Sequence, residues 1–229
     1  MTTVTDRLSL FPCVVSDPCE IDRLRWFQTA RYVECGLLDQ LPQELPADPH
    51  VHLSTYFGVY TEDGEIQATA RIVSDDIGLP MMKYHSLFPE AQASFDACRG
   101  TVSELSRLAV AGDAARRLNL SLLGREIIRF GADNPQASLL FASVSDSLRR
   151  ILNRILQAEP QLAGPAIPQY ADFAGVVSPI MMDIVKCIAA LRQRDDARSR
   201  FFFEDLVIDL TDADAKAPAQ AVPLAAAGG

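Results

Sequence analysis

The 229-residue chain lacks several features that mark large classes of proteins. Hydrophobic residues make up 48% of it, yet no uninterrupted apolar run approaches the ~20 residues of a membrane span. The N-terminus has no basic segment followed by an apolar stretch, so no secretory signal is expected. Positive charge is also scarce, and the net charge of −9 argues against nucleic acid as a partner.

Reactive side chains are few and scattered. The five cysteines are odd in number and lack C-x-x-C spacing, which predicts reduced thiols in a cytoplasmic protein. Cys35 and Cys98 have no flanking signature of a nucleophile. The pair His50-x-His52 lacks a third ligand, so no metal site is expected there. The chain also contains no serine nucleophile elbow and no nucleotide-binding glycine pattern.

The most informative stretch is residues 101–131, which predicts a strand leading directly into an amphipathic helix. Residues 101–110 are rich in β-branched and aliphatic side chains, and leucines recur at helical spacing after them until Gly131 ends the pattern. The start of such a helix leaves backbone N–H groups that an anion can bind. Arg116 and Arg117 at this start fit either an exposed surface or a phosphate site.

Two ionisable residues, Glu104 and Arg107, stand inside the predicted strand. Burying charged groups is costly unless they are paired or used, so they form either a structural ion pair or part of a reaction centre. Residues three apart on a flat strand point to opposite faces, so a shared site requires a β-bulge.

The rest of the chain predicts a mixed sheet with helices on its faces, an α/β (α+β layered) domain. Residues 1–19 are expected to form an irregular lead-in, 20–210 the domain, and 211–229 a disordered tail rich in Ala, Pro and Gly. Within the domain we predict helices at 20–38, 89–97, 147–158 and 179–191, a hairpin of 53–60 and 66–73, strands at 138–145 and 201–210, an extended edge at 164–172, and proline-containing loops at 39–52 and 74–84.

The segment VSELSRLAV (Val102–Val110) resembles the E-x-S-R strand of acyl-homoserine-lactone synthases and their relatives among GNAT-fold acyltransferases. Flanking blocks resemble the same group through Arg71, Leu79-Pro80-Met81-Met82, Phe88-Pro89, Gly164-Pro165, Tyr170, Gly175 and Pro179. The likeness covers residues 20–210 in order.

Two departures from the lactone synthases narrow this resemblance. Those enzymes carry a tryptophan and an E-x-D-x-x-D cluster that serves S-adenosylmethionine, whereas here a proline-rich loop holds Asp39, Glu44 and Asp48 in a different spacing. This favours the sister group, the long-chain N-acyl amino acid synthases. The GNAT pyrophosphate loop is also missing, since RRLNLS from Arg116 has no glycine, which favours acyl carrier protein as the donor.

The resemblance implies a GNAT-like, mostly antiparallel sheet with a splayed parallel strand pair and helices on both faces. It implies an N-acyltransferase that moves a fatty acyl group from an acyl carrier protein, or acyl-CoA, thioester to the amine of an amino acid, with no tightly bound cofactor. Acyl-homoserine-lactone synthesis from S-adenosylmethionine and a non-catalytic acyl-binding module remain alternatives.

The same resemblance suggests roles for individual residues. Glu104 or Glu34 would be the general base, with Arg107 as a further catalytic residue. Arg25, Arg71 or Arg107 would hold the acceptor's carboxylate, and a backbone N–H near Leu108 and Val110 would stabilise the oxyanion. Phe88 and Ser143 are further substrate-binding candidates, and Arg116 and Arg117 would bind the donor.

Overall fold

An eight-stranded sheet forms the centre of the protein in the computed structural model, which describes residues 10–112, 116–134, 137–156, 160–170, 173–194 and 196–203. The strands are β1 (Leu10–Val15), β2 (Ser54–Thr61), β3 (Ile66–Ser74), β4 (Val102–Val110), β5 (Leu139–Val144), β6 (Gln161–Leu162), β7 (Ile167–Tyr170) and β8 (Phe173–Asp183). The helices are α1 (Pro18–Glu34), α2 (Pro89–Ala97), α3 (Arg116–Asp133), α4 (Asp146–Leu156), α5 (Ile184–Arg192) and α6 (Ala197–Phe203), with short 3-10 helices η1 (Val51–Leu53), η2 (Asp75–Ile77) and η3 (Pro80–Lys83). No helix in these ranges is long and apolar enough to cross a membrane.

The strand order is β1-β2-β3-β4-β5-β8-β6, and β7 pairs with β8. Only β4 and β5 run parallel among the described pairs. Their ladder begins at Val102 and Leu139 and stops at Leu105 and Ala142, although β4 continues along β3 to Val110. The predicted mixed sheet with a splayed parallel pair is confirmed.

The part of β4 beyond this ladder contains a β-bulge. Thr69 pairs with Ala109 and Arg71 with Ser106, so β4 has one residue more than β3 between these pairs. Arg107 has a φ of 55°, the only positive φ among the described non-glycine residues. Leu105 and Leu108 both contact the same apolar cluster, whereas residues three apart on a regular strand face opposite ways. The bulge therefore lets Arg107 share a face with Glu104.

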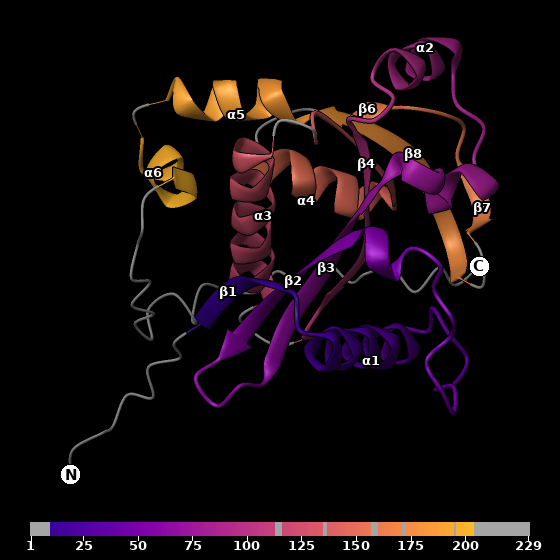
Figure 1. The fold of residues 1–229 in the computed structure, drawn as a ribbon, viewed down its shortest axis with the longest axis vertical. Helices are drawn as coiled ribbons and strands as arrows, with labels where there is room; N and C mark the ends of the chain where they lie inside the picture. Colours follow the sequence, from indigo (N-terminus) through magenta and orange to yellow (C-terminus); the bar gives the residue numbers. More distant parts are fainter. Residues whose placement is uncertain are drawn as a thin grey trace.

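The two faces of the sheet differ in their packing (Figure 1). One face carries the main core, in which the sheet packs against α3, α5 and α6 through Leu122, Ile128, Ile188, Phe202 and their neighbours. The other face carries two smaller clusters. One lies under α1 around Leu24 and Tyr56, and the second involves α2 and η3 around Met81, Phe95 and Phe141. Tyr56 pairs in register with Arg71, and Phe141 with Glu104, so both ionisable residues lie on this second face.

Several predicted elements are confirmed with shifted ends. Asp17 caps α1 by accepting a hydrogen bond from the Glu20 N–H at 2.9 Å, and the helix ends at Glu34, just before Gly36 in the left-handed region. Gly131 does not end α3, which runs on to Asp133. A Cβ at Gly131 would lie 2.6 Å from Cγ2 of Ile184, so this glycine permits close packing of α3 against α5.

Three predictions are wrong. Leu10–Val15 form edge strand β1 rather than an irregular lead-in, and Pro12 is tolerated there because an edge strand can leave an N–H position unpaired. Residues 179–183 belong to β8, and the helix begins only at Ile184, where Asp183 accepts from the Lys186 N–H at 2.9 Å. Residues 201–203 form the end of α6 rather than a strand, while 204–210 and the predicted tail lie outside the described residues.

Candidate functional site

A buried carboxylate, Asp48, joins two arginines from neighbouring strands. One oxygen of Asp48 binds Nη1 of Arg71 and lies 2.9 Å from Nη2 of Arg107. The other oxygen accepts the His50 N–H at 3.0 Å. Burial alone would raise the pKa of Asp48, but the two arginine charges and this N–H outweigh it and hold the pKa below its usual range. Asp48 is therefore an anion that ties the 39–52 loop to the sheet.

The two arginine side chains differ in how accessible they are to a ligand. Arg71 also donates from Nε to Oγ of Ser106 at 3.1 Å, and its side chain is only 4% exposed. Arg107 donates from Nη1 to Oε1 of Gln28 at 3.0 Å, and its side chain is 29% exposed. Arg107 is thus the member of the cluster that a ligand can reach from outside.

Glu104 is buried beside these arginines and is 1% exposed. Its Oε2 accepts the Met81 N–H at 2.8 Å. Burial raises the pKa of Glu104 to about 7, against the lowering effects of that N–H, Arg71 and Arg107. Arg107 makes its ion pair with Asp48, so Glu104 is not its salt-bridge partner. A carboxyl group with a pKa near 7 can accept a proton at neutral pH, as a general base must.

Other predicted site residues take different places. Arg25 binds Asp22 at 2.9 Å and donates to the Pro46 carbonyl at 2.6 Å, which fixes the loop that carries Asp48. Glu34 is exposed at the end of α1 and pairs with Arg31, so it is not brought to Glu104. Phe88 is exposed before α2, and its N–H donates to the Ala163 carbonyl at 2.7 Å.

The donor-side candidates lie around the splayed strands. Leu108 and Val110 pack their side chains into the main core, so only their backbone can serve the site. Ser143, on β5, is hydrogen-bonded to Nε2 of His85 at 2.9 Å. Arg116 and Arg117 are exposed at the start of α3.

Sequence reasoning missed the roles of Asp48, Gln28 and His85. Asp48 was visible only as one of three loop acids, and nothing in the spacing distinguishes it from Asp39 or Glu44.

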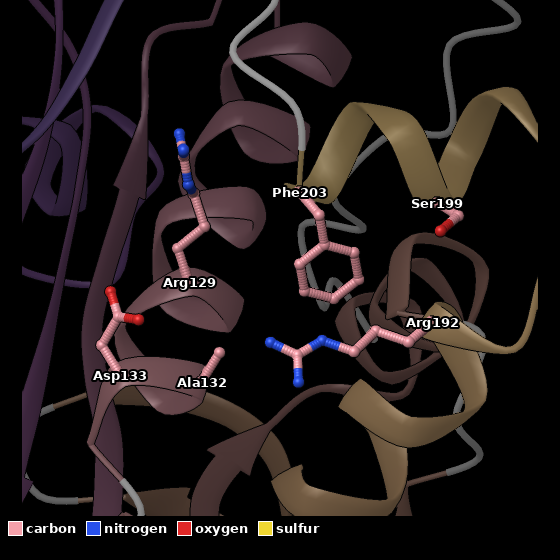
Figure 2. Close-up of a pocket in the computed structure, with 6 residues that line it drawn as sticks. All are labelled: Arg129, Ala132, Asp133, Arg192, Ser199 and Phe203. Atoms are coloured by element: carbon pink, nitrogen blue, oxygen red, sulfur yellow. The ribbon is translucent and has the colours of Figure 1, made fainter.

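A hollow lined by Arg129, Ala132, Asp133, Arg192, Ser199 and Phe203 lies between α3, α5 and α6 (Figure 2). There the Arg192 guanidinium stacks 5.1 Å from the centre of the Phe203 ring. These helices pack on the face opposite Glu104, so this hollow is separate from the Asp48 cluster.

Several solved structures have a fold similar to that of this chain. They include FeeM, an N-acyl amino acid synthase from uncultured soil microbes, with a TM-score of 0.58 at 13% identity over 80% of this chain and 94% of that one. TofI in complex with an inhibitor and MTA has a TM-score of 0.55 at 21% identity, over 78% of this chain and 95% of TofI. BjaI, a CoA-dependent acyl-homoserine lactone synthase with MTA, has a TM-score of 0.56 at 15% identity, over 82% of this chain and 89% of BjaI.

The fold is the one found in an N-acyl amino acid synthase and in an acyl-homoserine lactone synthase. The family model of the N-acyl amino acid synthase FeeM matches residues 23–176, more than half of the 229-residue chain. The chain therefore belongs to the FeeM family of N-acyl amino acid synthases. The matched range contains Asp48, Arg71, Glu104 and Arg107. No curated protein matches the sequence.

Proposed function

We propose that this protein transfers a fatty acyl group from the thioester of acyl carrier protein, or of acyl-CoA, to the amine of an amino acid. The observation that carries the proposal is Glu104, a buried carboxyl with a pKa of about 7 beside two arginines. It lies on β4 immediately before the point at which β4 and β5 diverge. The opening between the two strands thus has a base, Glu104, for the acceptor's amine and arginine side chains for the acceptor's carboxylate.

The acceptor arrives as an ammonium ion and must lose a proton before it can attack. Glu104 takes that proton, and the Met81 N–H keeps its carboxylate in place. The amine nitrogen then bonds to the thioester carbonyl carbon. The C–S bond breaks and its electron pair goes to sulfur. The second proton, which the nitrogen loses as the amide forms, goes to this sulfur, so the products are the amide and the free thiol.

The donor is proposed to lie along the unpaired edge of β4. Beyond Leu105 this strand has no ladder with β5, so its backbone groups on that side are available to a pantetheine arm. A backbone N–H among residues 108–110 would stabilise the oxyanion that forms on the thioester carbonyl. Because Leu108 and Val110 keep their side chains in the main core, this backbone is held rigidly.

The acceptor's carboxylate is assigned to Arg107. Of the other two candidates, Arg25 binds Asp22 and the Pro46 carbonyl. Arg71 binds Asp48 and Ser106 and is almost fully buried. With Glu104 ionised, as a base must be, the two arginines balance Glu104 and Asp48, so an amino acid zwitterion binds without leaving an unbalanced charge in the site. The sulfonium of S-adenosylmethionine finds no spare anion here because Asp48 is already shared by two cations, so lactone synthesis is disfavoured.

A direct experiment compares these alternatives. The protein is incubated with acyl carrier protein charged with fatty acids, a pool of amino acids and S-adenosylmethionine, and the products are read by mass spectrometry. We expect N-acyl amino acids, with thiol released only when an amine is present. Methylthioadenosine and acyl-homoserine lactone as main products would establish the lactone alternative, and thioester that stays intact in every mixture would indicate a non-catalytic binding module.

We predict that Arg107→Gln weakens binding of the acceptor selectively. Losing a charged hydrogen bond should raise the KM for the amino acid about tenfold to hundredfold. The KM for the donor should change little, because the donor runs along the backbone. The control is the amino acid amide, which has no carboxylate, so wild type and variant should handle it alike. An equal penalty with acid and amide would show that Arg107 does not bind the carboxylate.

We predict that reversing Arg116 and Arg117 to Glu raises the KM for acyl carrier protein and removes its salt dependence. Both arginines are exposed and can attract an acidic carrier despite the overall charge of −9. A short acyl-pantetheine donor without the carrier serves as the control and should react as before. Unchanged kinetics with the full carrier would place its docking surface elsewhere.

One further residue in the first turn of α3 supports a donor path there. Asn119 is fully buried, and neither its amide nitrogen nor its oxygen has a hydrogen-bond partner in the described part of the chain. The amide groups of a pantetheine arm could pair with both atoms. Asn119→Leu should therefore raise the KM for acyl-pantetheine as well as for the charged carrier, unlike the arginine reversal. A buried water as the true partner would leave both constants unchanged.

A further inference from the structure

His85 and Ser143 form a hydrogen bond at the end of the β4–β5 ladder. Nε2 of His85 lies 2.9 Å from Oγ of Ser143, although the residues are 58 positions apart. His85 is buried and Ser143 is partly buried. The acyl-transfer chemistry described above uses neither residue through this contact, so the pair calls for an explanation.

The register of the strands places Ser143 on the same face as Glu104. Phe141 pairs with Glu104, and β5 continues in regular register with β8, so Ser143 faces the same way as Phe141 two residues earlier. Ala142 makes the last ladder pair, with Leu105. Ser143 is therefore the first β5 residue at the opening between the strands.

The segment 81–85 is hydrogen-bonded to both strands, β4 and β5, that border the opening. The Met81 N–H binds the carboxylate of Glu104 on β4 at 2.8 Å. The Met81 carbonyl accepts the His85 N–H at 3.1 Å, and the His85 ring reaches Ser143 on β5. Residues 81–85 thus set the position of the general base on one strand and of a hydroxyl group on the other.

We propose that the Ser143 hydroxyl binds the thioester of the acyl donor and that His85 is the positioning residue that orients it. This inference rests on the proposed acyl transfer. The acceptor's ammonium proton goes to Glu104, the electron pair of the breaking C–S bond goes to sulfur, and the second proton that nitrogen loses as the amide forms goes to that sulfur. Ser143 donates a hydrogen bond to the sulfur as this charge develops, forms no covalent bond and keeps its proton.

The imidazole is suited to this role because it adds no charge. Burial lowers the pKa of His85 below its usual range, so the ring is neutral at pH 7. A neutral ring fixes one rotamer of Ser143 without attracting the acceptor's carboxylate away from Arg107. Met81, whose carbonyl accepts the His85 N–H, and Phe141, two residues before Ser143 on the same face, are both apolar and fully buried.

The test measures kcat and both KM values for Ser143→Ala, His85→Leu and the double variant, with melting temperature as the check on folding. We expect each single variant to lose about tenfold to hundredfold in kcat, below the loss typical of an oxyanion-hole donor. The KM for the amine should stay the same. The double variant should be no slower than Ser143→Ala alone, because His85 acts only through Ser143. His85→Gln, which keeps a hydrogen-bonding side chain, should recover part of the rate.

Losses that multiply in the double variant, or a changed KM for the amine, would overturn the proposal. So would wild-type turnover in Ser143→Ala. A second measurement does not depend on activity. The ¹⁵N resonances of the His85 ring should shift when a non-hydrolysable acyl-pantetheine thioether is added, and not with an amino acid alone. A wild-type protein that shows this shift but transfers no acyl group would contradict the proposed function and leave the donor contact standing, whereas an absent shift would contradict the donor contact.

Discussion

Replacing Glu104 by glutamine is expected to slow acyl transfer about a hundredfold or more while the protein stays folded. Glutamine has the shape of the carboxylate and can still accept the Met81 N–H, but it cannot take a proton from the acceptor. The rate of thiol release from charged acyl carrier protein measures this effect. Glu34→Gln is the matched control, since Glu34 is exposed and paired with Arg31, and should leave turnover unchanged.

The pH profile should identify the same group. Only ionised Glu104 accepts a proton, and its pKa is raised from 4.5 to about 7. The rate of the wild-type protein should therefore fall as the pH drops below about 7. The glutamine variant should lack this acid limb in its residual rate. A wild-type rate that stays flat down to about pH 5 would contradict a base with this pKa.

Stability should move in the opposite direction from activity. A raised pKa means that the folded protein binds the proton more tightly than the unfolded chain does, so this stabilisation is fully present below pH 4.5 and is lost as the pH rises through about 7. Above that, a buried ionised Glu104 carries a penalty on the order of 3 kcal/mol. Glu104→Gln should thus melt at a higher temperature than wild type at about pH 8. If Glu104 were only a structural ion-pair partner, the variant would instead melt lower and keep its turnover.

The strand that carries Glu104 could be predicted from the sequence, but its bulge could not. Residues 102–110 have the composition of a strand, and their local pattern places Glu104 and Arg107 on opposite faces. The shared face arises from a register shift against β3 between Thr69 and Arg71. Such a shift depends on a partner more than thirty residues away, and no local period records it.

The two wrong predictions near the C-terminus, a helix starting at residue 179 and a strand starting at residue 201, also result from contacts between distant segments. Residues 176–182 are largely apolar, and a short apolar run fits a buried strand as well as a helix. Pairing with β5 and β6 decides in favour of the strand, and Asp183 then starts α5. Phe201 to Phe203 pack on the main core from a helix because α3 and α5 offer an apolar surface there.

Asp48 is the clearest example of a site residue that the sequence could not identify. Its loop could be predicted from the prolines of residues 39–52, but the sequence could not say which of the three acids would be buried. The choice is made by two arginines that the bulge and the β3–β4 register bring together. The proposed base, Glu104, was therefore one of two candidates in the sequence, while the residues that surround it come from three separate segments of the chain.

Asp48→Asn should remove most of the activity and much of the stability. Without the carboxylate, Arg71 and Arg107 face each other with no shared anion, and breaking a buried ion pair in this way costs about 3–5 kcal/mol. Because Asp48 raises the pKa of Glu104, its loss should also move the acid limb of the remaining activity to lower pH. Denaturant unfolding and the pH profile of the residual rate measure the two effects.

Asp22→Asn is the control for this last experiment. It also removes an aspartate bound to an arginine, but Asp22 is exposed, so the expected loss is about 1 kcal/mol or less. If Asp48→Asn proved as stable as Asp22→Asn and kept its acid limb, the Asp48 cluster would not be the frame of the site. If it lost stability but kept the wild-type pH profile, Asp48 would hold the loop without influencing Glu104. If the variant lost stability and its pH profile also shifted, Asp48 would have two roles. It would hold Arg107, which binds the acceptor's carboxylate, and it would raise the pKa of Glu104.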